Sequence, residues 1–101
     1  MIDTIIKQIK EVVPVRYRVF KSKPPVPFAV YYEDGTENFA ADNTVYLKRV
    51  DYILELYADK KDHEIESKIE QIFAANDTPW EKEESYIEQE RLLMTAYYFT
   101  L

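Results

Sequence analysis

Apolar residues recur at every third or fourth position in two segments of the chain, and each pattern predicts an amphipathic helix. The first segment predicts a helix over Ile2 to Val12, which Pro14 ends because the residue before a proline avoids the α conformation. The apolar stripe of the second segment consists of Ile65, Ile69, Ile72 and Phe73. It predicts a helix that begins after the potential capping side chains at 59–62 and ends near Ala75.

Alternation of apolar and polar residues predicts strands between and after the helices. The expected strands cover 15–20, 28–33, 45–58, 80–87 and 91–101. The strand at 45–58 combines one apolar face with one mixed face, which is typical of a sheet that helices cover on one side. The element order is therefore α-β-β-β-α-β-β, and the predicted fold class is α+β, a mostly antiparallel sheet packed against two helices. No internal repeat divides the sequence, so residues 1–101 are expected to form one domain.

Proline and glycine mark the connections. Residues 21–27 hold three prolines and predict an extended connector, since proline cannot donate a backbone hydrogen bond to a sheet. The only glycine lies in Asp34-Gly35, and Asp-Gly after an aromatic strand predicts a hairpin turn. We expect the chain to return through 36–39 and to bend again at 40–44. Such a hairpin would project from the body of the domain.

The composition is poor in the residues that usually build catalytic and cofactor sites. The chain has one glycine, one histidine, no cysteine and nine tyrosines, and its net charge is −6. Sites for phosphate, zinc and acyl transfer usually need Gly-rich loops or His and Cys clusters, so we expect neither an enzyme nor a bound cofactor. The negative charge argues against specific nucleic-acid binding, and no apolar segment approaches the roughly 20 residues of a membrane span. Tyrosine, with an apolar ring and a polar hydroxyl, suits surfaces that bind other proteins.

Two sets of polar residues have the composition of chemical sites but not the spacing. The first set consists of Asp59, Asp62, His63, Glu64 and Glu66. On a helix whose apolar stripe faces the core these side chains point in different directions, so we interpret them as acids at a solvated helix start and expect no metal site. The second set joins Asp51 to Glu66 and Lys68, a combination used by some nucleases. In those sites the acid and the lysine share a strand, whereas here they lie on a predicted helix.

Charge gathers in two further segments. A short basic run contains Arg16, Arg18, Lys21 and Lys23, and five acids surround Trp80 and Tyr86: Glu81, Glu83, Glu84, Glu88 and Glu90. The basic run is expected to form a solvated strand edge. The acids are expected to cover the exposed face of the penultimate hairpin, with Trp80 packed on the core. They leave open a second interpretation, a small acidic cytosolic adaptor that docks on a basic protein.

Three stretches of the chain resemble a group of small prophage proteins. They are 25–32 (Pro-Val-Pro-Phe-Ala-Val-Tyr-Tyr), 38–43 (Asn-Phe-Ala-Ala-Asp-Asn) and 52–59 (Tyr-Ile-Leu-Glu-Leu-Tyr-Ala-Asp), the last followed by Lys-Lys-Asp and an Ile-rich helix. This group is similar to the tail-terminator, or tail-completion, proteins of long-tailed bacteriophages. The resemblance covers nearly the whole chain from Pro14 onward.

The resemblance implies a subunit of a sixfold ring at the head–tail junction of the virion, assembled in the bacterial cytoplasm. Its partners would be other copies of itself, the tail-tube protein and the head-connector protein. The contact residues expected under this hypothesis are Tyr31, Tyr32, Asp34 and Phe39 on the hairpin, with Arg49 and Glu55 on the mixed face of the long strand. A head–tail connector of similar size and fold stays open as an alternative.

Overall fold

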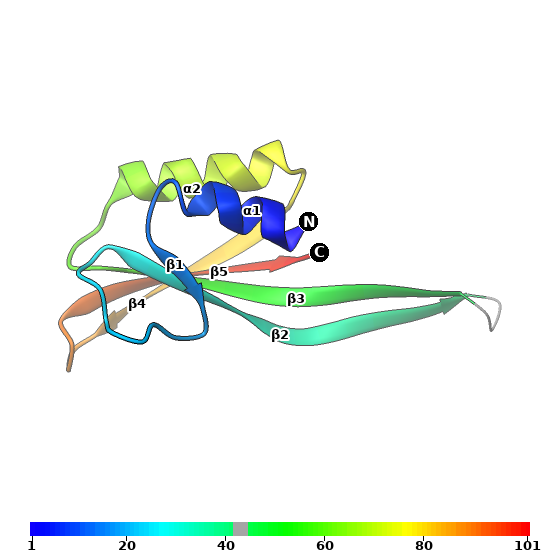
Figure 1. Ribbon diagram of the computed structural model, residues 1–101, viewed down its shortest axis with the longest axis horizontal. Helices are drawn as coiled ribbons and strands as arrows, with labels where there is room; N and C mark the ends of the chain where they lie inside the picture. Colours follow the sequence, from blue (N-terminus) through cyan, green and yellow to red (C-terminus); the bar gives the residue numbers. More distant parts are fainter. Residues whose placement is uncertain (42–44) are drawn as a thin grey trace.

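The computed structural model describes residues 1–41 and 45–101, and the side chains of 37–48 lie outside this description. Two helices, α1 (Ile2–Ile9) and α2 (His63–Ala75), lie side by side on one face of a five-stranded sheet (Figure 1). The strands are β1 (Val15–Tyr17), β2 (Phe28–Ala41), β3 (Val45–Ala58), β4 (Trp80–Ile87) and β5 (Leu92–Thr100). The predicted α+β class and the predicted order of elements are confirmed.

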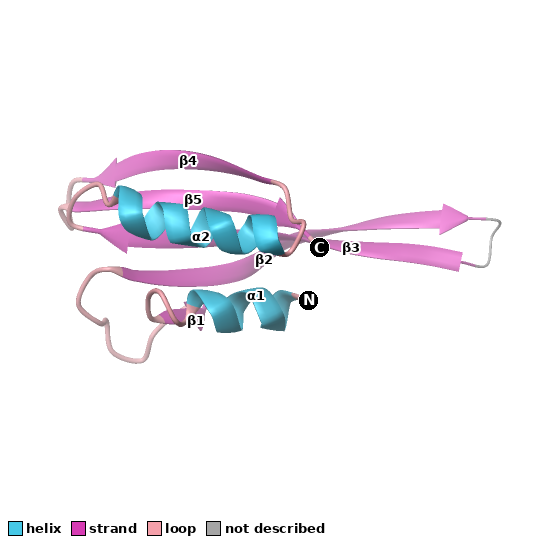
Figure 2. Ribbon diagram, turned by 90° about the horizontal axis from the view of Figure 1, so that it is seen from above, coloured by secondary structure: helices cyan, strands magenta, loops and turns pink. Residues whose placement is uncertain are grey.

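The sheet has the strand order β1-β2-β3-β5-β4 (Figure 2). β1 runs parallel to β2, and every other neighbouring pair is antiparallel. Two parallel strands need a long connection, and residues 18–27 provide it here. This segment contains the predicted connector at 21–27, whose prolines keep it out of the sheet. β1 and β4 therefore form the two outer edges of the sheet.

The core fills the space between the helices and one face of the sheet. From the helices it takes Ile5, Ile6, Ile9, Ile69 and Phe73, and from the central strands Tyr52, Leu54, Leu56, Tyr97 and Phe99. The ring of Phe73 lies 4.7 Å from that of Phe99 between centroids, and both side chains are buried. Because alternate residues of a strand point to opposite faces, this core confirms the apolar and mixed faces predicted for 45–58 over its described side chains, 49–58.

Two elements end three residues before their predicted last residue. α1 ends at Ile9 and not at Val12, and the next residues continue in tight turns with backbone bonds from Val12 and Val13 to the Ile9 carbonyl. The first strand ends at Tyr17 and not at Phe20, because Arg18 adopts a positive φ of 66° that breaks the extended conformation. Val13 is nevertheless buried, so the apolar stripe extends past the helix itself.

The predicted turn at Asp34-Gly35 is wrong. β2 runs without interruption through these residues to Ala41, and Gly35, with φ of 127°, lies in a β-bulge where the register shifts between Glu33 and Thr36. Glycine adopts a positive φ readily both in a bulge and in a turn. The Asp-Gly pair therefore predicts the backbone conformation at Gly35 but does not distinguish a bulge from a turn. The bend predicted at 40–44 falls partly outside the described residues.

β2 and β3 extend well beyond the rest of the molecule, as Figure 1 shows, and the longest dimension reaches 51 Å. Toward the tip of this hairpin, Val50 is the last described residue whose backbone pairs with a third segment of the chain. Its partner there is Leu101. We call residues 36–41 and 45–50 the arm. Its strands pair with each other from Thr36–Val50 to Ala41–Val45.

Candidate interaction surface

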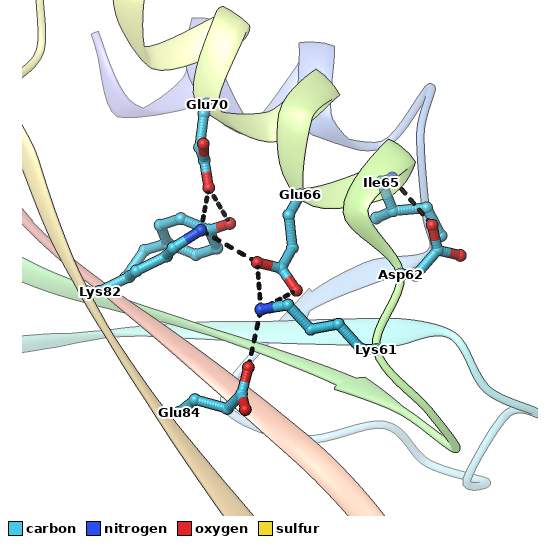
Figure 3. Close-up of polar contacts among 8 residues, drawn as sticks. Lys61, Asp62, Ile65, Glu66, Glu70, Lys82 and Glu84 are labelled. Carbon is cyan, nitrogen blue, oxygen red and sulfur yellow. Dashed lines mark hydrogen bonds and ion pairs between the residues drawn. The ribbon is translucent and has the colours of Figure 1, made fainter.

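A network of charged side chains joins α2 to the edge strand β4 (Figure 3). The Lys82 ammonium donates to Glu70 at 2.7 Å and to Glu66 at 3.0 Å. Lys61, just before the helix, donates to Glu66 at 2.9 Å and to Glu84 of β4 at 2.7 Å. The Glu66 carboxylate therefore lies between two ammonium groups, and its side chain is only 4% exposed.

This burial corrects the interpretation of Glu66 as an acid on a solvated helix start. The start of α2 does carry a side-chain cap, as predicted, because the Asp62 carboxylate accepts a hydrogen bond from the Ile65 amide at 3.1 Å. Glu66 lies one turn further along and faces β4. A buried carboxylate needs compensating charge, and here Lys61 and Lys82 supply it from segments distant in the sequence. The network holds α2 against the sheet.

The network and the core raise the pKa of Tyr97. Burial has the largest effect, followed by the hydrogen bond that the Tyr97 hydroxyl donates to Glu70 at 2.8 Å. The hydrogen bond from Lys82 to Glu70 likewise raises the pKa of Lys82, and the bond from Lys61 to Glu84 raises the pKa of Lys61. All three groups hold their protons more tightly in the folded chain than in the unfolded chain.

This linkage predicts a loss of stability at alkaline pH. Because the folded chain retains these protons longer, the stabilisation is complete below the unfolded tyrosine pKa of about 10 and is lost as the pH rises through the folded values. Tyr97→Phe should make the free energy of unfolding fall less steeply above pH 10, by about 1.4 kcal/mol per pH unit. Urea unfolding followed by circular dichroism measures this slope. Tyr86→Phe, at an exposed tyrosine, should keep the wild-type slope; an equal change in both variants would contradict the assignment.

The sheet face opposite the helices, which we call the open face, has a carboxylate between two tyrosines. Glu55 accepts a hydrogen bond from the Tyr32 hydroxyl at 2.6 Å and another from the Tyr57 hydroxyl at 2.7 Å. Burial and then the bond to Glu55 raise the pKa of Tyr32 to about 12. The Arg18 guanidinium lies over the Tyr32 ring, 5.5 Å from its centroid. These groups make the open face aromatic and polar at once.

The connector between β1 and β2 covers one end of the open face. Phe20 packs edge-on against Phe28, which stacks on Tyr57, and Lys23 forms an ion pair with Glu90 in the β4–β5 turn. A groove of about 450 Å³ remains between the connector and the sheet. The other end of the open face, toward the arm, is not crossed by the connector.

The structure separates five of the six predicted contact residues into three groups. Tyr32 and Glu55 meet on the open face, as described above. Asp34 and Arg49 are exposed and line a shallow notch of about 440 Å³ at the base of the arm. Tyr31 packs on the helix side against the core, because neighbouring residues of β2 face opposite ways. Phe39 belongs to β2, but its side chain lies outside the described residues.

The remaining sequence candidates are scattered. Trp80 packs edge-on against Tyr97, as predicted. The acids near it do not share a face, since Glu84 binds Lys61 on the helix side while Glu83 accepts from Tyr98 on the open face at 3.0 Å. Within the described residues, no group of three or more His, Cys, Asp or Glu side chains is arranged to hold a metal ion. Neither of the described helices is long and apolar enough to cross a membrane.

The buried polar atoms are also accounted for. Every buried side-chain nitrogen and oxygen in the described part of the chain has a hydrogen-bond partner. The features that stand out are the arm, the open face and the charged outer strands, all of which are surfaces. In comparisons with known proteins, no protein-family model and no curated protein matches the chain.

Proposed function

We propose that this protein is a structural subunit of a long-tailed phage, a tail-terminator or tail-completion protein that acts as a ring at the head–tail junction. The proposal assigns it no catalytic residue, cofactor or metal. Its partners are other copies of the chain, the tail-tube protein and the head-connector protein. The resemblance of the three sequence stretches supplies this identity and the sixfold symmetry.

The arm is the observation that carries the proposal. A two-stranded hairpin that leaves its own domain exposes backbone groups on both outer edges, and a neighbouring molecule can pair with them. An isolated two-stranded hairpin is at best marginally stable in water, so contact with a neighbour would stabilise it. The body of the domain supplies a rigid base, because β2 and β3 continue into the centre of the sheet. This arrangement suits a subunit that holds on to adjacent molecules.

A head–tail connector is the alternative within the same class, since it would also use a ring and a projecting arm. The acidic adaptor is a second candidate from another class. The outer strand β4 favours it, because its exposed acids could attract a basic protein surface. An adaptor would act as a monomer or dimer and would not need the arm for self-association.

The native mass of the purified protein, measured over a wide concentration range, tests the proposal, together with negative-stain electron microscopy of the concentrated sample. We expect hexamers that appear as rings with a central opening. A stable dimer at every concentration would instead support the adaptor. A chain that remains monomeric at the highest concentration would contradict the ring.

A further inference from the structure

The two outer edges of the sheet carry opposite charge. Between Val12 and Tyr32 the sequence contains four cations and no acid, and this segment includes the edge strand β1. Residues 81–90 contain five glutamates and one lysine, and they include the other edge strand, β4. With four neighbouring spacings between them, the two edges lie about 19 Å apart. The molecule is therefore charged asymmetrically across its sheet.

The strand register aligns these charges in rows on the open face. One row of paired residues crosses the sheet from Arg16 through Val30, Glu55 and Ala96 to Glu83. The next row on this face runs from Tyr32 through Ile53 and Tyr98 to Glu81, and Arg18 lies over the ring of Tyr32. The first row thus runs from an arginine of β1 to a glutamate of β4. In the second row Arg18, the residue after β1, lies over the first ring, and a glutamate of β4 lies at the other end.

The four terminal charges are exposed and remain available for a partner. Among the described residues, the ion pairs use Lys23, Lys61, Lys68 and Lys82 as cations, and none of the four charges at the row ends takes part. Glu83 accepts a hydrogen bond from Tyr98, which leaves its second oxygen able to accept another. The Arg18 guanidinium carbon lies 5.6 Å from the centroid of the Tyr17 ring and 5.5 Å from that of the Tyr32 ring. A guanidinium carries five N–H donors, so donors remain for a partner.

We propose that the β1 edge of one copy of this chain docks against the β4 edge of a second copy, with Arg16 facing Glu83 and Arg18 facing Glu81. A sideways shift by one sheet width brings both pairs together at once, because each row ends in opposite charges. β1 of one copy then runs antiparallel to β4 of the next. This joint rests on the proposed function and deepens it by assigning the contact between ring subunits.

The occupant is a second copy because the charge pattern complements itself. A net charge of −6 makes two copies repel each other on average, whereas contact between the basic edge of one copy and the acidic edge of the next is attractive. The two edges are different surfaces, so the contact is head-to-tail, and such contacts produce closed rings when the rotation between neighbours closes.

Charge reversal tests the joint. Glu81→Lys/Glu83→Lys puts cations at both ends of the two rows, and Arg16→Glu/Arg18→Glu puts acids at both ends of the two rows. Each variant should lose self-association by more than about 100-fold at low salt, because two attractive pairs become repulsive. A 1:1 mixture should associate again, and so should the chain that carries all four substitutions, in which the edges are exchanged. Glu11→Lys/Glu64→Lys, at two exposed acids of the helix layer, controls for net charge and should associate like the wild type.

Sedimentation and electron microscopy of the same samples separate this joint from the proposed function. Rings that form equally well from the edge variants would overturn the joint and leave the ring intact. Edge-dependent dimers or filaments without rings would support the joint and contradict the proposed function. A mixture or exchanged chain that fails to associate, although circular dichroism shows a folded protein, would also overturn the joint. A wild-type chain that stays monomeric at every concentration would overturn both.

Discussion

Replacing Lys61 and Lys82 together with methionine is expected to lower the free energy of unfolding by about 3–5 kcal/mol. Both lysines donate to Glu66, whose side chain is 4% exposed, and their removal leaves a buried carboxylate without a cation. Methionine preserves most of the apolar length of lysine, so the loss reports the charge and not the packing. A domain of this size has a total stability of about 5–15 kcal/mol, so the variant should lie close to the limit of folding. Urea unfolding at neutral pH measures the difference.

A third substitution distinguishes buried charge from general damage. Adding Glu66→Leu removes the uncompensated carboxylate, and a leucine at this place can pack between α2 and β4. The triple variant should therefore recover most of the lost stability, since apolar groups often replace a buried ion pair without cost. Lys7→Met/Lys68→Met, at two exposed lysines, should stay within about 1 kcal/mol of the wild type. If the first double variant matched this control, solvent would have to reach Glu66.

Shortening the arm is expected to abolish self-association while the domain stays folded. Replacing residues 38–48 with Asn-Gly would connect Glu37 to Arg49, which are partners in the register, through a turn that suits a two-residue hairpin. The bulge at Gly35 and the pairing of Val50 with Leu101 would remain. We expect the native mass to fall to that of the monomer at concentrations at least about tenfold above those at which the full chain assembles.

The melting temperature separates loss of contact from loss of fold. Because the core lies between the helices and the centre of the sheet, the shortened chain should melt within a few degrees of the full chain, while its rings disappear from micrographs. Gly35→Ala in the full-length chain is the control for the melting temperature and for ring formation. It strains the bulge beside the arm and leaves the length of the arm unchanged. Rings that persist without the arm would exclude the arm as a contact between subunits and would direct attention to the sheet edges.

The arm and the charged edges would have different roles in one assembly. The proposed edge joint is a lateral contact between neighbouring bodies, whereas the arm projects beyond the body of the domain (Figure 2). Lateral charge pairs weaken as salt increases, because exposed charges are screened beyond about 10 Å at 0.1 M. Backbone hydrogen bonds between the arm and a neighbour carry no net charge and would be less sensitive to salt. Association at low and at high salt therefore reports on the two surfaces separately.

The sequence by itself determined the elements and the faces that they bury. Periodic apolar residues in the helices and alternation in 45–58 act within a few residues of chain, so they can be recognised without knowing the fold. The cap at Asp62 and the extended connector with its three prolines are local for the same reason. The mixed face that holds Glu55 also followed from alternation, and its partner Tyr32 was among the predicted contact residues.

Only the tertiary structure decided which distant segments meet. Asp34-Gly35 has the composition of a turn, but pairing with β3 on both sides of it makes it a bulge and sends β2 on into the arm. In the sequence Glu66 is indistinguishable from a solvated acid at a helix start. In the fold, β4 lies next to α2, so that Lys82 reaches the Glu66 carboxylate and the Glu66 side chain is buried. The rows that end in Arg16 and Glu83 depend on four successive registers. Register is set by long-range pairing, which a single sequence without its fold does not specify.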